Sequence, residues 1–187
     1  MSADIQTAQQ GFSLIEVSIV TAIVLLMAII GVPAIGGYVV ENKVPKVGEE
    51  LARFILQTKV NAPGGTAAPY SGIDTSNFAN MVRGSSVFSL TGTESAARVL
   101  HGLGTDGEVA VAEAASGAAF SITLSKVHHA ACPSIASVMQ RVADIITVAA
   151  EGQAATTVKD ANTSYSALAT ESRCGKGDIN TFVFTAS

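Results

Sequence analysis

A long run without charge most constrains how this chain can fold. Residues 17–40 contain no Asp, Glu, Lys, Arg or His. About 20 residues of apolar helix are enough to cross the hydrocarbon core of a bilayer. The sequence therefore predicts one membrane-spanning helix near the N-terminus.

Glu16 stands directly before this run, inside a hydrophobic segment that begins at Phe12. An ionised side chain in a membrane span is costly, so such residues are rare and normally have a partner. We therefore expect a function at Glu16. The alternative is a plain signal anchor that carries a stray glutamate.

Gly11, Phe12 and Glu16, followed at once by an apolar helix, resemble the processing site and N-terminal helix of the type IV pilin family. The resemblance implies that a prepilin peptidase cuts after Gly11 and N-methylates Phe12. It also implies that Glu16 pairs with the terminal amine of a neighbouring subunit. The expected partners are copies of this chain, the peptidase/N-methyltransferase, an inner-membrane assembly platform and, before assembly, the lipid bilayer.

Three parts of the chain are expected: a cleaved leader at residues 1–11, a membrane and assembly helix at 12–61, and a globular head at 62–187. The leader is polar and lacks the apolar core of an ordinary secretory signal. Its removal would leave the membrane helix in place.

The predicted helix continues beyond the membrane because apolar residues recur at helical spacing after the uncharged run. This stripe consists of Val40, Val44, Val47, Leu51, Phe54 and Thr58. We expect the stripe to seat the head. Gly31, Pro33 and Pro45 should kink the helix, since proline removes a backbone hydrogen bond. The Pro-Gly-Gly sequence at 63–65 should end it.

The head is expected to be α+β, with the long helix packed on an antiparallel sheet. Alternation at 108–112 and 118–124 predicts two neighbouring strands. Phe120, Ile122 and Leu124 then share one face, with Phe120 in the core against the long helix. Further expected elements are a short helix at 77–82, a strand at 86–90, a helix at 133–149 and a terminal strand at 181–185.

The chain has two cysteines, Cys132 and Cys174. Two cysteines in an exported domain, without metal-type spacing, predict one disulfide in an oxidising compartment. It would bound the region 132–174. The alternative is a pair of unpaired buried thiols.

Other chemistry is disfavoured. Residues 102–107 match a dinucleotide fingerprint, but a strand pattern follows where the fingerprint needs a helix. His128 and His129 lack a second Cys/His pair at metal-ligand spacing, and we interpret them as exposed loop residues. The net charge of −4 gives no basic patch for obligatory nucleic-acid binding. We expect no enzymatic activity, cofactor or metal.

The head pattern resembles a type IVb major pilin of the conjugative thin-pilus or bundle-forming kind, although Phe12 and the short leader are more typical of type IVa. The resemblance implies a surface filament for adhesion, conjugation or motility. Alternatives are a minor pilin, a type II secretion pseudopilin and, more distantly, a membrane-anchored periplasmic binding module.

The expected location is the inner membrane, with the head in the periplasm, and then the extracellular filament. The positive-inside rule alone would place the flank Lys43, Lys46, Arg53 and Lys59 in the cytoplasm. The processing motif and the disulfide both require the head outside, and we give them precedence.

Overall fold

The computed structural model describes residues 12–92 and 97–187, with the backbone alone at 32–34. The chain divides into two units, Met1–Gly36 and Gly37–Ser187. The predicted leader at 1–11 lies outside the described residues.

The first helix, α1, runs from Leu14 to Asn61 and supplies the predicted long N-terminal helix. The Pro-Gly-Gly sequence follows directly, and Gly65 there has a φ of +79°, which a side chain rarely tolerates. The helix is continuous through Gly31, Pro33 and Pro45. These residues therefore do not break it, and a bend at them stays a prediction.

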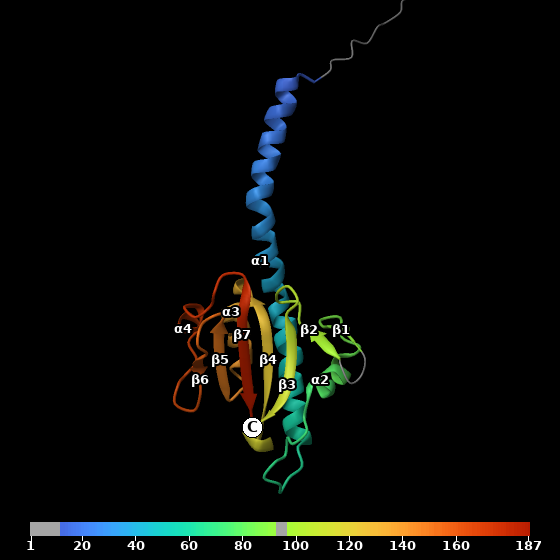
Figure 1. The fold of residues 1–187 in the computed structure, drawn as a ribbon, viewed down its shortest axis with the longest axis vertical. Coiled ribbons are helices and arrows are strands. Elements are labelled where there is room, and N and C mark those ends of the chain that lie inside the picture. Colours follow the sequence, from blue (N-terminus) through green and yellow to red (C-terminus); the bar gives the residue numbers. More distant parts are fainter. Residues whose placement is uncertain (1–11, 93–96) are drawn as a thin grey trace, which may run out of the picture. The chain divides into compact units, whose positions relative to one another are not determined.

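The head is built on one antiparallel sheet of seven strands in the order β1-β2-β3-β4-β7-β5-β6 (Figure 1). The strands are β1 (Ser89–Thr91), β2 (Arg98–Leu100), β3 (Glu108–Ala114), β4 (Ala119–His128), β5 (Ile145–Ala150), β6 (Thr156–Lys159) and β7 (Asp178–Ala186). The sheet confirms the α+β class. The expected strand at 86–90 is observed as the shorter β1.

The C-terminal strand β7 lies at the centre of the sheet, between β4 and β5. Its Phe184 is opposite Ile122 of β4 and Ile146 of β5, and all three side chains are fully buried. Alternate residues of each strand point to the same face. The last residues of the chain thus complete the core.

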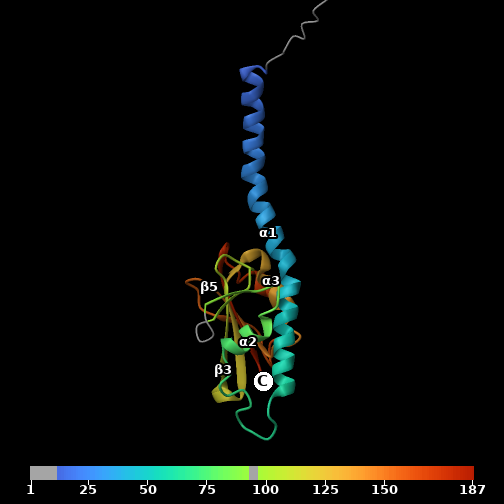
Figure 2. The same ribbon diagram turned by 90° about the vertical axis from the view of Figure 1, so that its right-hand side faces the viewer.

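The later part of α1 covers one face of the sheet (Figure 2). Val44, Val47, Leu51 and Phe54 of the predicted stripe are buried. The ring of Phe54 meets that of Phe120 edge-on, with centroids 6.2 Å apart. This contact confirms that Phe120 packs in the core against the long helix.

Gly48 lies on the same side of α1 and allows a close approach. A Cβ there would come within 2.5 Å of Val138 Cγ1. Val138 belongs to α3 (Cys132–Met139), which the structure packs against α1 at this point. The other helices in the described part of the chain are short: α2 (Thr75–Val82), α4 (Ala167–Glu171) and the 3₁₀ turns η2 (Ala115–Gly117) and η3 (His129–Ala131).

The helix predicted at 133–149 is wrong in its second half. Helix α3 ends at Met139, and Ile145–Ala150 form strand β5. The Lys159 ammonium donates to the carbonyls of Gln140 and Ala143 and so caps the end of α3. The β-branched residues after Asp144 pair with β7, and this long-range pairing overrides the helical spacing.

Candidate functional site

The first turn of α1 is closed by Ser13 and Glu16. The Ser13 backbone N–H donates to Glu16 Oε2 at 2.9 Å, and Ser13 Oγ accepts from the Ile15 N–H at 3.3 Å. Ser-x-x-Glu is the spacing of a capping box; here Glu16 makes its half of that motif, while Ser13 Oγ accepts from the N–H of Ile15 and not from that of Glu16. The spacing is visible in the sequence, although the pilin resemblance alone did not point to it.

The capping box gives Glu16 a role within its own chain. Its carboxylate also lies where the partial positive charge of the helix N-terminus favours an anion. An ionised carboxylate can accept several hydrogen bonds. Capping Ser13 therefore leaves Glu16 able to receive a second, external donor.

The N-terminal part of α1, on both sides of Glu16, presents apolar side chains all round. Leu14 is 90% exposed, and the side chains that follow it are exposed as well. They include Ile15, Val17, Ile19, Val20, Ile23, Val24, Leu25, Leu26, Met27, Ile29 and Ile30. The mean hydropathy of its most apolar window is 2.6, so the helix is long and apolar enough to span a membrane.

Two hydroxyl side chains in the apolar stretch after Glu16 are satisfied within the helix. Ser18 Oγ donates to the Ile15 carbonyl at 2.9 Å, and Thr21 Oγ1 donates to the Val17 carbonyl at 2.7 Å. Such bonds let hydroxyls sit in an apolar medium without an external partner. Glu16 is different because its charge cannot be satisfied by its own helix alone.

Several predicted residues are placed only in part. Gly11 lies outside the described residues, so the cleavage site is not seen. Phe12 is 88% exposed. The surroundings of Gly31 are open, since a Cβ there would meet no atom within 4 Å. Pro45 is exposed on α1.

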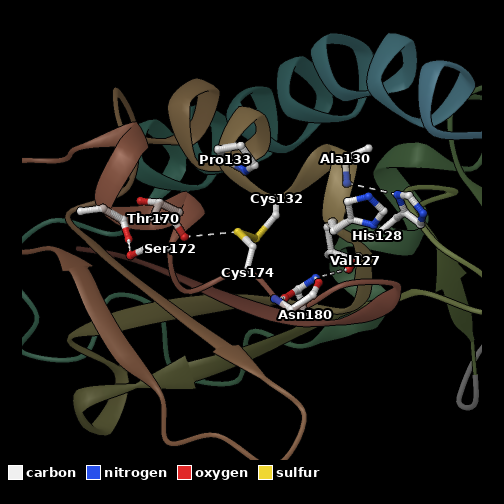
Figure 3. Close-up of a disulfide and its surroundings, with 12 residues drawn as sticks. Val127, His128, Ala130, Cys132, Pro133, Thr170, Ser172, Cys174 and Asn180 are labelled. Atoms are coloured by element: carbon white, nitrogen blue, oxygen red, sulfur yellow. Dashed lines mark hydrogen bonds between the residues drawn. A yellow bond between two sulfur atoms is a disulfide. The ribbon is translucent and has the colours of Figure 1, made fainter. Parts of the chain in front are cut away.

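The predicted disulfide is present between Cys132 and Cys174 (Figure 3). It joins the start of α3 to the turn after α4. Cys132 is fully buried, and Cys174 is half-buried with its sulfur 3.2 Å from the Thr170 carbonyl. The crosslink therefore ties the segment between β6 and β7 to the core.

Asn180 organises the turns beside the disulfide, a role that was not predicted from the sequence. Its side-chain amide donates to the carbonyls of Val127 and Gly175, and its Oδ1 accepts from the Gly175 N–H. The residue is fully buried. The sequence does carry a signal for it, because Asn180 stands in the inward register of β7 with Phe182 and Phe184.

All three histidines of the chain use Nδ1 to accept a backbone N–H. The donors are Leu103 for His101, Ala130 for His128 and Gly177 for His129. His101 is fully buried and its Nε2 lies 2.8 Å from the Ser125 carbonyl. Burial lowers the pKa of His101. These contacts fix the orientation of the three imidazole rings at this end of the sheet.

The interpretation as exposed loop residues is wrong for His128, which is half-buried at the end of β4, whereas His129 is exposed at the start of η3. Desolvation, and then the nearby charges of His128 and Lys176, lower the pKa of His129. Asp178 accepts from the Thr105 N–H, and its Oδ1 lies 4.0 Å from His128 Nε2. Among residues 12–92 and 97–187, no three such side chains converge as metal ligands.

The C-terminal part of the chain is similar to a known family. Residues 104–187 match the family model described as PilS, N terminal. The matched region begins in the loop before β3 and includes the disulfide and β7. No curated protein matches the chain.

Proposed function

Because residues 104–187 match PilS, a type IV pilin-related family, we propose that this chain is the structural subunit of a type IV pilus. It would be cut after Gly11, N-methylated at Phe12 and polymerised through its apolar helix. The filament would serve adhesion, conjugation or motility. The head would lie in the periplasm before assembly and on the filament surface afterwards.

One observation supports polymerisation most directly: a carboxylate stands directly before an apolar run, residues 17–40, that contains no cation to neutralise it. In a bundle of such helices, an unpaired Glu16 would be strongly disfavoured. The amine of Phe12 in a neighbouring subunit would supply the missing cation. Only the register that brings the two together would then be stable.

The capping box refines this proposal. In the isolated chain, Glu16 holds the Ser13 N–H, and in the filament it would also accept the neighbour's amine. The two roles separate chemically, because a glutamine retains an oxygen that can accept from Ser13 but carries no charge. Glu16→Gln is therefore the informative variant, and Glu16→Ala removes both roles.

Two variants and one control test the proposal in a strain that assembles filaments. We expect Glu16→Gln and Glu16→Ala to be processed after Gly11 but to lower filament yield about 100-fold or more, as loss of a buried ion-pair partner costs about 3 kcal/mol or more. Ser13→Ala weakens the cap and keeps the charge, so its filaments should persist. Yield is measured by shearing, and processing by mass analysis of the N-terminus.

Different results would overturn the proposal. A mature chain that retains residues 1–11, or abundant filaments from Glu16→Gln, would contradict it. The amount of the chain in sheared filaments separates the alternatives: a major pilin dominates them, a minor pilin or pseudopilin is a trace, and an anchored binding module is absent.

A further inference from the structure

A hollow of about 390 Å³ lies in the head between α1 and the glycine-rich loop at 102–107. Lys43 and Lys46 line it from the helix, and Gly102, Gly104 and Asp106 line it from the loop. The pilin proposal does not use this hollow. The loop also carries the sequence motif that we set aside as a nucleotide site.

The loop that walls the hollow is held rigidly. The buried His101 accepts the Leu103 N–H, and its ring contacts Gly107 so closely that any Cβ at Gly107 would overlap it. A Cβ at Gly104 would overlap the Lys126 carbonyl. The Leu103 carbonyl in turn accepts from the His128 N–H at 2.7 Å. The wall is therefore preformed and does not need a ligand to order it.

The hollow contains charges that the head itself does not pair. Within the described part of the chain, no carboxylate oxygen lies within 4.0 Å of the ammonium of Lys43 or Lys46. Asp106 likewise forms no ion pair there, and the nearby Arg98 is bound to Glu108. Two cations thus face one anion across a polar hollow.

The position of the lysines along α1 suggests what enters the hollow. Lys43 and Lys46 follow Val40, the last residue of the uncharged run, by three and six residues. At 1.5 Å per residue, this places them roughly 5 and 9 Å beyond it along the helix. The polar headgroup region of one leaflet is about 5–7 Å thick. Both side chains can therefore reach the depth of lipid phosphates.

We propose that this hollow binds the headgroup of a zwitterionic phospholipid of the ethanolamine type. The phosphate lies between Lys43 and Lys46, and the lipid ammonium lies against Asp106. The lipid thereby offers each of these three exposed side chains a group of opposite charge. This inference rests on the proposed membrane insertion of α1.

The charge pattern favours this ligand over two others. A free phosphate ion would bring its charge beside Asp106, whose carboxylate repels it. An acidic side chain of a neighbouring subunit would satisfy the lysines but leave Asp106 without a partner. A headgroup that carries both signs satisfies all three side chains.

The test uses the full chain in mild detergent with added phosphatidylethanolamine, phosphatidylglycerol or inorganic phosphate, and native mass spectrometry to count bound molecules. We expect phosphatidylethanolamine retention to fall about 30-fold in the double variant Lys43→Gln/Lys46→Gln, because this variant loses the attraction of two lysines for the lipid phosphate. Asp106→Asn should weaken phosphatidylethanolamine alone. Lys176→Gln, which changes a lysine outside the hollow, should have no effect.

Equal retention by the double variant would overturn the proposal. Displacement of the lipid by inorganic phosphate would also overturn it, because it would indicate a site for a free anion. If the double variant changed filament contacts alone, the partner of the lysines would be a neighbouring subunit, and the proposal would again be wrong. Flotation of the same variants with phosphatidylcholine vesicles reports insertion of α1 separately. Loss of headgroup binding with intact flotation rejects this inference without rejecting the proposed function.

Discussion

Removing the crosslink between Cys132 and Cys174 should destabilise the head by a predictable amount. The two residues are 42 positions apart in sequence. In the chain-entropy model, a loop of this length raises the free energy of unfolding by about 4 kcal/mol. The Cys132→Ala/Cys174→Ala variant is preferred to serine, because a hydroxyl would be buried at the fully buried Cys132.

The assay is urea unfolding of the full chain in detergent, followed by near-ultraviolet circular dichroism. Tyr165 is a suitable probe, since its hydroxyl donates to the Pro133 carbonyl at 2.8 Å and lies 3.0 Å from Ser137 Oγ. It therefore reports on the region that the disulfide ties to α3. With a urea slope of about 2 kcal/mol/M, the midpoint should fall by about 2 M.

The control is the wild-type protein in reducing agent, which removes the bond but keeps both sulfur atoms. It should unfold near the midpoint of the double variant. Midpoints that differ strongly would assign the effect to packing of the sulfur atoms. A shift below about 0.5 M in both samples would refute the entropic reasoning.

Three further predictions concern the head. Burial lowers the pKa of His101, so as the pH falls the unfolded chain takes up a proton at this residue before the folded chain does. The free energy of unfolding should therefore be full above about pH 6.5 and fall below it by up to about 1.4 kcal/mol per pH unit. In pH-dependent melts, His101→Gln should reduce this slope. Phe120→Ala should cost about 3–5 kcal/mol in urea unfolding, because the side chain is fully buried against Phe54; a loss below about 1 kcal/mol would contradict this placement. Gly48→Ala should lower the free energy of unfolding by about 1 kcal/mol or more despite the better helix propensity of alanine, because the new Cβ would meet Val138. In a double-mutant cycle, Val138→Ala should relieve part of this loss, so that Gly48→Ala/Val138→Ala is more stable than the sum of the two single effects predicts.

The histidine geometry gives the pH prediction its direction independently of burial. Protonating Nδ1 of His101 would place a second donor against the Leu103 N–H, which lies 3.0 Å away. The same conflict exists at His129, whose Nδ1 accepts from the Gly177 N–H. Acid should therefore loosen the turns at 101–107, 129–131 and 175–180 before the rest of the sheet, and hydrogen exchange can locate this loosening.

The N-terminal half of the molecule was largely predictable, because its signals are local. An uncharged run, a capping pair and a stripe with helical period each act over a few residues, and the structure has α1 ending at Asn61 as expected. The disulfide was also predictable, since the chain has only two cysteines. The capping role of Glu16 was equally readable from Ser13 three residues before it.

Long-range pairing decided what the sequence left open. The run after Met139 fits a helix by spacing, yet Ile145–Ala150 become a strand because β7 offers partners opposite Ile146 and Val148. The hollow beside Lys43 and Lys46 exists only because the fold brings the 102–107 loop to this part of α1. Local periodicity reports the face that a segment buries, whereas the identity of its partner depends on residues far away in the chain, so only the tertiary structure could supply it.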